Sequence, residues 1–297
     1  MEYGDKHILV LGAGASGIGA SWVLAQVGAH VVLNDYKPVT LPTAEEERLV
    51  SAGVEIITGR QDESLLDGVD RIVISPGISL DIPIVKAAQA RGIDVVSEVE
   101  LAYEVSKSPI VAVTGTNGKT TTTTLLTKVL EGSGKPVRVG GNIGDSLSEV
   151  AYSMPAGGFL VAELSSYQLE TIKHFRPIGA IMLNITPDHL ARHKTMENYI
   201  AAKERIFENQ LKSDYLVLNI DDSVVADMEH RAPSHILQIS QKQTVENGAY
   251  YANSQCYVVE NGVATAVIGD EDIHIPGSHN IENILTVIAL TYALGVP

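Results

Sequence analysis

Short apolar runs rich in β-branched residues alternate with helical stretches over the first hundred residues of the chain. Because these runs are apolar throughout, they are typical of parallel strands that helices cover on both faces. Five of them predict strands, namely His7 to Leu11, His30 to Asn34, Val54 to Ile57, Arg71 to Ile74 and Asp94 to Val96. The pattern therefore predicts an α/β protein that begins with a Rossmann-like, doubly wound parallel sheet.

The alternation is interrupted by the sequence Ser-Lys-Ser-Pro at residues 106–109 and then starts again. Four further runs predict buried strands that end at polar residues, namely Ile110 to Val113, Phe159 to Ala162, Ala180 to Leu183 and Tyr215 to Leu218. Two later features are expected: a hairpin turn at Asn261-Gly262, between Cys256 to Glu260 and Val263 to Ile268, and a helix from Asn280 to Leu294, closed by Gly295. We expect two α/β domains, residues 1–97 and residues 98–297.

Residues 114–121 read Thr-Gly-Thr-Asn-Gly-Lys-Thr-Thr and follow a predicted strand directly. Such a glycine-rich turn aims backbone N–H groups at one anion, Lys119 adds a positive charge, and Thr120 offers a hydroxyl to Mg²⁺. Only the second half of the G-x-x-x-x-G-K-[ST] pattern is present, because Val113 stands where the first glycine would be. The segment predicts a P-loop-type ATPase domain with ATP and Mg²⁺ as ligands.

A second glycine-rich turn, Gly12-Ala13-Gly14-Ala15-Ser16-Gly17, follows the first strand, and Asp35 stands at the end of the next one. This is the dinucleotide-binding layout, which favours NAD, although the same turn can hold any nucleotide diphosphate. Residues 75–78, Ser-Pro-Gly-Ile, would line the same crevice or form an ordinary β-turn. The N-terminal domain is therefore predicted to bind a nucleotide diphosphate.

Polar side chains follow two strands of the second domain. Glu163 is a candidate Mg²⁺ ligand, or alternatively a helix-start glutamate, and residues 184–189 bring Asp188 and His189 to the same sheet edge. His189 and His193 have the spacing of a zinc-protease helix, but Leu190 replaces the required glutamate, which disfavours that class.

Three further polar residues lie on predicted helices. On its helix, Lys203 is by default a solvated lysine. Asn280 and Asn283 could bind an adenine edge, whereas the alternative for them, Asn280 in particular, is helix capping.

The composition narrows the class of protein. A formal net charge of −15 argues against nucleic acid and anionic membranes as partners, since both carry like charge. One cysteine, no signal segment and no long apolar run predict a soluble, cytoplasmic protein without disulfides. We expect a monomer.

Taken together, these motifs resemble the Mur ligases of peptidoglycan synthesis, over Leu9 to Gly295. The loop at 114–121 is shared with folylpolyglutamate synthases. Residues 163–170, 75–78 and 184–189 resemble the branch that adds D-glutamate to UDP-N-acetylmuramoyl-L-alanine.

The resemblance implies a role for each matching residue. The UDP substrate would contact Gly14, Ser16, Gly17, Asp35, Ser75 and Asn142. ATP would contact Gly115, Thr116, Asn117, Gly118, Lys119, Thr120, Thr121, Asn280 and Asn283. Mg²⁺ ligands would be Thr120, Glu163, His189 and Lys203, the last as a carbamate. Lys119, His189 and Lys203 would be the catalytic residues.

The implied reaction is ATP-dependent: the substrate carboxylate takes the γ-phosphate, and the amine of D-glutamate then displaces it from the acyl phosphate. Two departures from the family are visible. Ala191 stands where an aspartate is usual, and no third, amino-acid-binding domain follows, so we expect a fragment that binds ligands without completing ligation. The alternatives are a folylpolyglutamate synthase, which the N-terminal domain disfavours, and a non-catalytic NAD(P)-binding module.

Overall fold

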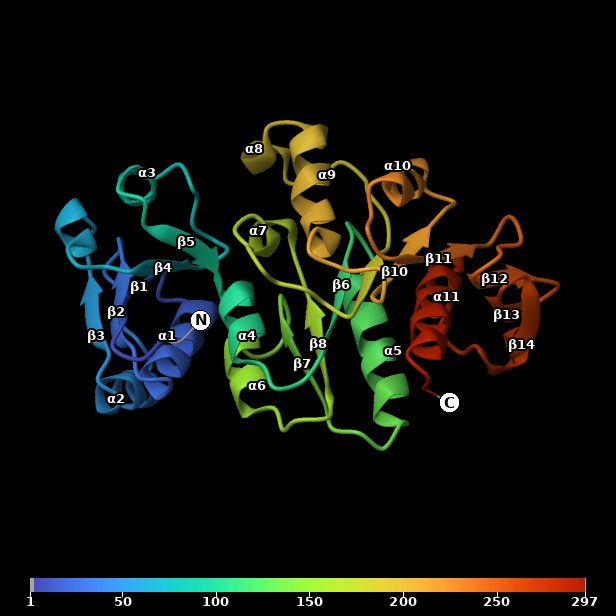
Figure 1. Ribbon diagram of the computed structural model, residues 1–297, viewed down its shortest axis with the longest axis horizontal. Coiled ribbons are helices and arrows are strands. Elements are labelled where there is room, and N and C mark those ends of the chain that lie inside the picture. Colours follow the sequence, from blue (N-terminus) through green and yellow to red (C-terminus); the bar gives the residue numbers. More distant parts are fainter. Residues whose placement is uncertain (1–2, 297) are drawn as a thin grey trace. The chain divides into compact units, whose positions relative to one another are not determined.

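The computed structural model describes residues 3–296, which form two compact units (Figure 1). Unit 1 comprises residues 3–107 together with two later segments, Gly144–Met154 and Tyr167–Phe175. Unit 2 comprises Ser108–Ile143, Pro155–Ser166 and residues 176–296. The main break falls between residues 107 and 108, inside the interruption at 106–109, and the domain boundary at 97 and 98 stays a prediction.

Unit 1 is built on a five-stranded sheet in the order β3-β2-β1-β4-β5, with every pair parallel. Its strands are β1 (His7–Leu11), β2 (His30–Asp35), β3 (Glu55–Thr58), β4 (Arg71–Ile74) and β5 (Asp94–Ser97). Its helices are α1 (Ala15–Gln26), α2 (Thr43–Ser51), η1 (Glu63–Leu66), α3 (Pro83–Ala90), α4 (Glu98–Val105) and α6 (Leu147–Ser153). The short helix α7 (Ser166–Leu169) also belongs to unit 1, except for its first residue. The order confirms the predicted doubly wound sheet, with a hydrophobic core on each face.

Two buried carboxylates on α4 hold the later segments of unit 1 in place. The Glu98 carboxylate accepts hydrogen bonds from the Ser146 hydroxyl and the Ser148 N–H at 2.5 and 2.8 Å. The Glu100 carboxylate accepts from the backbone N–H groups of Lys173, His174 and Phe175 at 2.7 to 3.0 Å. Backbone donors that no strand or helix uses are thereby satisfied inside the unit.

Unit 2 contains a nine-stranded sheet in the order β14-β13-β12-β11-β10-β9-β6-β8-β7. Pairing is parallel from β7 to β12 and antiparallel from β12 to β14. The strands are β6 (Ile110–Thr114), β7 (Val137–Gly141), β8 (Phe159–Glu163), β9 (Gly179–Met182), β10 (Tyr215–Asn219), β11 (His235–Ser240), β12 (Gly248–Ala252), β13 (Gln255–Glu260) and β14 (Val263–Gly269). The parallel part is the sheet expected of a P-loop-type domain.

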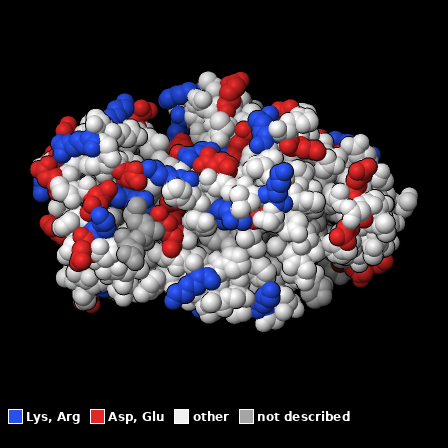
Figure 2. Space-filling view, in the orientation of Figure 1, with Lys and Arg blue, Asp and Glu red and all other residues white. Residues whose placement is uncertain are grey.

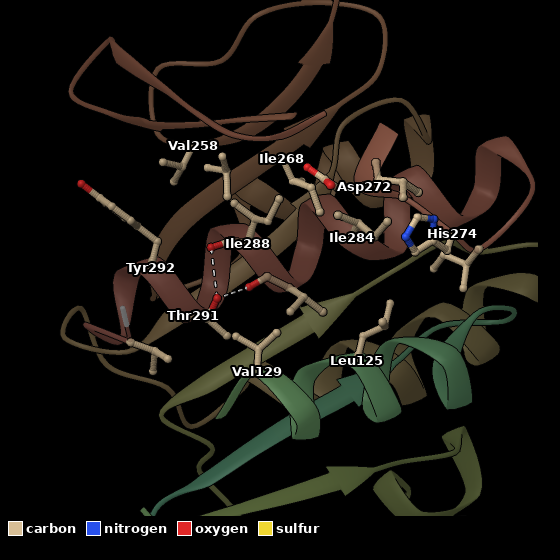
Figure 3. Close-up of a pocket in the computed structure, with 15 residues that line it drawn as sticks. Leu125, Val129, Val258, Ile268, Asp272, His274, Ile284, Ile288, Thr291 and Tyr292 are labelled. Carbon is tan, nitrogen blue, oxygen red and sulfur yellow. Dashed lines mark hydrogen bonds between the residues drawn. The ribbon is translucent and has the colours of Figure 1, made fainter. Parts of the chain in front are cut away.

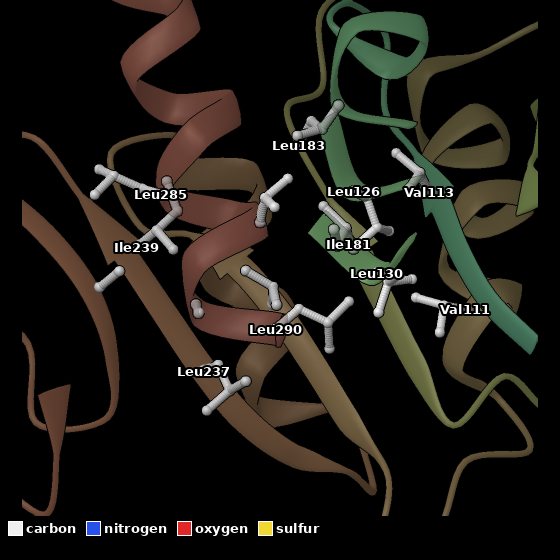
Figure 4. Close-up of a cluster of buried hydrophobic side chains, with 14 of the residues drawn as sticks. Val111, Val113, Leu126, Leu130, Ile181, Leu183, Leu237, Ile239, Leu285 and Leu290 are labelled. Atoms are coloured by element: carbon white, nitrogen blue, oxygen red, sulfur yellow. The ribbon is translucent and has the colours of Figure 1, made fainter. Parts of the chain in front are cut away.

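The helices of unit 2 include two long ones, α5 and α11, which lie side by side against the sheet (Figure 1). Its helical elements are α5 (Lys119–Glu131), α8 (Leu190–His193), α9 (Met196–Glu204), η2 (Arg205–Phe207), α10 (Ser223–Asp227), η3 (Met228–His230), η4 (Asp270–Asp272) and α11 (Ser278–Ala293), and α7 begins at Ser166. Figure 4 shows Leu126 and Leu130 of α5 and Leu290 of α11 on the buried side of the strands, and Leu285 of the same buried cluster beside Ile239. This shared core fixes the direction of both helices.

Most of the predicted elements are confirmed. The hairpin turn has positive φ at Asn261 (50°) and Gly262 (77°), the conformation that an Asn-Gly turn favours. The last helix begins at Ser278, two residues before its predicted start. Three strands were not predicted: β7 and β12 contain glycine or alanine at several positions, and β11 mixes polar residues into its apolar run. In the part of the chain that the structure describes, no helix has the length and apolarity needed to cross a membrane.

Candidate functional site

The phosphate loop joins the end of β6 to the first residue of α5. Gly118 adopts φ of 85°, and a Cβ atom at this position would lie 2.7 Å from Oδ1 of Asn283. Glycine is therefore required here for both backbone conformation and space. The N-terminus of α5, which starts at Lys119, faces the loop, and its free N–H groups and dipole suit a phosphate.

Asn184, two residues after the end of the neighbouring strand β9, holds the loop. The carbonyl of Asn184 accepts from Thr116 N–H at 2.9 Å, and its side-chain oxygen accepts from Asn117 N–H at 2.8 Å. The Asn184 amide donates back to the carbonyl of Asn117 at 3.1 Å. The sequence-based predictions give Asn184 no role of its own, although its place after a buried strand is the signal that could have found it.

Two lysines converge on the backbone of the loop. Lys119 Nζ donates to the carbonyls of Gly115 and Thr116 at 3.1 and 2.8 Å. Lys203 Nζ donates to the carbonyl of Gly115 at 2.8 Å. The interpretation of Lys203 as a solvated helix lysine is wrong, since its side chain is only 2% exposed. Its helix, α9, carries Tyr199 one turn earlier, and the ammonium lies 5.0 Å from the centre of that ring.

The environment of the two lysines disfavours their charged forms. Burial, together with the positive charge of Lys119, lowers the pKa of Lys203 to about 7, against the opposing effect of Asp188. Burial also lowers the pKa of Lys119, while the nearby carboxylates of Glu163 and Asp188 counteract it. Lys119 therefore interacts electrostatically with Glu163, Asp188 and Lys203, and lysines with perturbed pKa values of this kind cluster at functional sites.

The lowered pKa of Lys203 predicts a pH-dependent stability. From about pH 7 to 10.5 the unfolded chain holds a proton on this amine that the folded chain releases, so the free energy of unfolding rises with pH. One such group contributes up to about 1.4 kcal/mol per pH unit. Urea unfolding of the chain and of Lys203→Met, in CO₂-free buffer at two pH values in this window, measures the difference. Equal pH slopes for the two proteins would contradict the assignment.

Glu163, at the end of β8, is buried and incompletely paired. Its Oε1 accepts from the side-chain amide of Asn142 at 2.9 Å, whereas its Oε2 has no hydrogen-bond partner among the residues that the structure describes. A buried carboxylate oxygen without a partner is costly unless a ligand satisfies it, and Mg²⁺ takes oxygen ligands of this kind. The unpaired oxygen of Glu163 is therefore one potential ligand for a divalent cation. Among residues 3–296, however, no group of three or more His, Cys, Asp or Glu side chains forms a metal cluster.

The histidine predicted as a ligand lies at a turn. His189 has φ of 54°, and its Nε2 lies 3.4 Å from Oδ2 of Asp188. His193, its neighbour in the disfavoured zinc spacing, is buried and forms a 2.9 Å hydrogen bond between Nε2 and the hydroxyl of Ser166. The two imidazoles therefore have separate partners. Thr120 and Thr121 are exposed at the start of α5, and Ala191 is exposed in α8.

Asn280 and Asn283 connect α11 to the phosphate loop. Asn283 Oδ1 accepts from the Thr122 hydroxyl at 3.1 Å, and its amide donates to Asn280 Oδ1 at 3.1 Å. Asn280 donates to the carbonyl of Pro276 at 2.6 Å. The capping alternative for Asn280 is wrong, because α11 has no side-chain cap and Asn280 lies inside the helix. The structure brings both amides to the N-terminal part of α5.

Side chains at the ends of neighbouring strands also form hydrogen bonds to the backbone of the glycine turn of unit 1, residues 12–17. Asp35 Oδ2 accepts from the N–H of Ala13 at 3.0 Å, and the Ser75 hydroxyl donates to the carbonyl of Gly12 at 3.3 Å. Gly14 lies directly before the first residue of α1 and has an extended backbone conformation. Because the turn follows β1, the N-terminus of α1 lies at the edge of the sheet where β1, β2 and β4 end. Asp35 and Ser75 thus shape the turn, at the crevice where doubly wound sheets bind ligands.

The fold and these two glycine-rich turns are typical of α/β nucleotide-binding proteins, and each unit has one candidate phosphate site. Comparison with known families agrees with this class. Residues 6–97 match the family described as "Mur ligase MurD-like, N-terminal domain", and residues 113–291 match "Mur ligase middle domain". The chain belongs to the Mur ligase family.

Similar proteins support the assignment. The chain is 45% identical over its whole length to the UDP-N-acetylmuramoylalanine--D-glutamate ligase of Thermoanaerobacter pseudethanolicus, and 46% identical to that of Caldanaerobacter subterraneus subsp. tengcongensis. It spans 65% of the length of each of these relatives. Among solved structures, the UDP-N-acetylmuramate:L-alanyl-gamma-D-glutamyl-meso-diaminopimelate ligase from Neisseria meningitides matches with a TM-score of 0.64 at 22% identity, over 98% of this chain and 94% of that one.

Proposed function

We propose that this chain binds the nucleotide substrates of a ligase that adds D-glutamate to UDP-N-acetylmuramoyl-L-alanine at the expense of ATP. Unit 1 would hold the UDP substrate, and unit 2 would hold ATP with Mg²⁺. In this proposal the protein is a cytoplasmic monomer. The named relatives, which are ligases of this specificity, support the substrate assignment.

One observation carries the proposal for unit 2. Two lysines and two carboxylates are coupled around a glycine turn that opens a helix, and the carboxylate of Glu163 keeps one oxygen unpaired. Phosphoryl transfer between two anionic groups needs concentrated positive charge and oxygen ligands for a metal ion. Lys119 at the loop would supply the positive charge, and Glu163 at the end of β8 would supply an oxygen ligand.

The residues would divide the work as follows. The loop N–H groups and Lys119 would bind and orient the phosphates, so that the γ-phosphate meets the attacking carboxylate in line. Thr120, Glu163 and His189 would hold Mg²⁺, which supplies neutralisation of phosphate charge when bound. Asn280 and Asn283 would receive the adenine, and Gly14, Ser16, Gly17, Asp35 and Ser75 of unit 1 would contact the UDP substrate.

Lys203 would complete the metal site after reaction with CO₂. Its low pKa leaves much of the amine neutral near pH 8, and the neutral amine is the form that adds CO₂. The resulting carbamate is an anionic oxygen ligand, which suits Mg²⁺ better than an ammonium does.

The metal assignment predicts the behaviour of Glu163→Gln. Removing the negative charge while keeping the shape should weaken ATP binding in the presence of Mg²⁺ by about tenfold, since metal sites lose affinity of this order when a ligand or its support changes. ATP binding in EDTA should stay unchanged, because no metal is then present. Calorimetric titration with ATP under both conditions measures the two affinities.

Glu131→Gln is the matched control for this experiment. Glu131 lies on the surface at the end of α5, where its carboxylate accepts a hydrogen bond from Lys128 at 2.8 Å. Its replacement should change neither titration. An equal loss of affinity with and without Mg²⁺ in Glu163→Gln would show that this carboxylate does not act through the metal.

A further inference from the structure

Asn142, the residue after β7, donates two hydrogen bonds to Glu163. Its backbone N–H donates to the carbonyl of Glu163 at 2.8 Å, and its side-chain amide donates to Oε1 of Glu163 at 2.9 Å. Because an ionised carboxylate only accepts hydrogen bonds, the amide nitrogen, and not the amide oxygen, must face Glu163. One residue therefore holds both the backbone and the carboxylate of Glu163, and both residues belong to unit 2.

The end of β7 is shaped for this contact. β7 and β8 are parallel, and Gly141 lies opposite Glu163 in their register. Gly141 has φ of 114°, and a Cβ atom there would lie 2.4 Å from the carbonyl oxygen of Glu163. Only glycine allows this backbone conformation together with so close an approach. Gly141 therefore brings the next residue, Asn142, against the carboxylate.

Glu163 lies beside the strand that leads into the phosphate loop. On the side away from β7, it is opposite Val113 of β6. Glu163 is only 1% exposed, yet its Oε2 has no hydrogen-bond partner within residues 3–296. Asn142 thus binds one oxygen and leaves the other. Since an amide is uncharged, it orients the carboxylate without neutralising the charge that attracts a cation.

Asn142 is itself exposed, unlike the carboxylate that it binds. Its side chain therefore adds little to a hydrophobic core, and packing does not account for its contacts. The resemblance to the family implies a contact with the UDP substrate, whereas the structure shows the amide bound to Glu163. Partners of this kind orient carboxylates that bind metal ions, and their loss typically costs roughly 10- to 100-fold in metal affinity.

A separate pocket of unit 2 does not suit ATP and its cation. A groove of about 680 Å³ lies between α5, α11 and β14, and Figure 3 shows Leu125 of α5 with Ile284 and Ile288 of α11 in its apolar lining. No Lys or Arg is among the described residues that line it, so a phosphate chain would find no charged donor there. A change in the affinity for ATP with Mg²⁺ therefore reports on the phosphate loop.

We propose that Asn142 is a positioning residue for the metal ion that accompanies ATP. It would hold the Glu163 carboxylate through Oε1, which leaves Oε2 for the cation, and it would act through Glu163 without touching the metal. This inference rests on the proposed metal role of Glu163. An exposed amide would then control the metal affinity of a buried carboxylate.

Two variants remove the donor: Asn142→Ala, and Asn142→Leu, which keeps the approximate size of the side chain. Each should weaken ATP binding in the presence of Mg²⁺ by about tenfold and leave ATP binding in EDTA unchanged. Calorimetric titration with ATP gives this Mg²⁺-dependent gain in affinity. Binding of Mg²⁺ alone is not a suitable readout, because acidic side chains are scattered over the visible faces of both units and attract cations (Figure 2).

A double variant shows whether Asn142 acts through Glu163. Once Glu163→Gln has removed the charge, Asn142→Ala should cause no further loss of the Mg²⁺-dependent gain, since residues that act through one interaction are not additive. Asn247→Ala is the matched control. Asn247 precedes β12, at the edge of the sheet where the parallel strands begin, and its Oδ1 accepts from the N–H of Asn261 at 2.9 Å. Its replacement should leave both titrations unchanged.

The outcomes separate this inference from the proposed function. An equal loss with and without Mg²⁺ in the Asn142 variants, a loss in Asn142→Ala but not in Asn142→Leu, or additive losses in the double variant would each overturn the inference. Normal Mg²⁺ dependence in the Asn142 variants, together with a loss in Glu163→Gln, would overturn it and leave the metal role of Glu163 standing. Normal Mg²⁺ dependence in Glu163→Gln would overturn both.

Discussion

Gly17→Ala should destabilise unit 1 by about 3 kcal/mol or more and abolish binding of the UDP substrate. A Cβ atom on residue 17 would fall on the carbonyl oxygen of Gly12, well inside van der Waals contact. That oxygen cannot retreat easily, because the N–H of Gly12 bonds to Asn34 at 2.8 Å and the Ser75 hydroxyl bonds to its carbonyl. Overpacking against fixed backbone has costs of this size. Urea unfolding and calorimetric titration measure the two effects.

Gly14→Ala is the matched control in the same turn. Residue 14 has φ of −85°, and a Cβ atom added there would meet no other atom within 4 Å. Alanine should therefore change the free energy of unfolding by less than about 0.5 kcal/mol. If the two substitutions proved equally harmful, the close approach of α1 to β1 would not be what requires glycine at position 17.

Lys119→Met should weaken ATP binding by about 100-fold, which corresponds to about 2.7 kcal/mol. The substitution removes the ammonium that orders the loop through two carbonyls and that would bond to the phosphates, and charge-assisted hydrogen bonds are worth this much. It also removes the positive charge that lowers the pKa of Lys203, so that pKa should rise. Fluorescence titration with a labelled ATP analogue gives the affinity.

Lys128→Met tests whether any lysine on α5 would have the same effect. Lys128 lies on the exposed side of the last turn and pairs with Glu131 at 2.8 Å. Because a surface ion pair contributes little, ATP affinity and stability should stay within experimental error. A similar loss in both variants would mean that general surface charge, and not the loop, attracts the nucleotide.

Local signals made the sheet and the two turns predictable. Parallel strands that are buried on both faces have continuous apolar sequences, and this pattern alone was enough to predict β1, β4 and β6. The glycine turns could be placed because each follows such a strand and precedes a helix. Their predicted neighbours at the sheet edge, Ser75 and Glu163, follow from the rule that parallel strands end at the same edge.

Long-range packing produced what the sequence could not show. Lys203 is 89 residues from Thr114, yet its ammonium reaches the loop, and nothing in the pattern of α9 distinguishes it from a surface lysine. Glu100 likewise looks like an ordinary helix residue, although its carboxylate binds three N–H groups more than 70 residues away. A charged side chain is buried where distant backbone groups would otherwise remain unpaired, and the hydrophobic periodicity of the sequence does not show which backbone groups these are.

The central claim is that a UDP-linked muramoyl substrate binds to this chain, and calorimetric titration with UDP-N-acetylmuramoyl-L-alanine tests it most directly. NADH serves as the control ligand, because the glycine turn of unit 1 also has the dinucleotide-binding layout. We predict saturable binding of the UDP compound, lost in Gly17→Ala, and no binding of NADH. Binding of NADH without binding of the UDP compound would contradict the account.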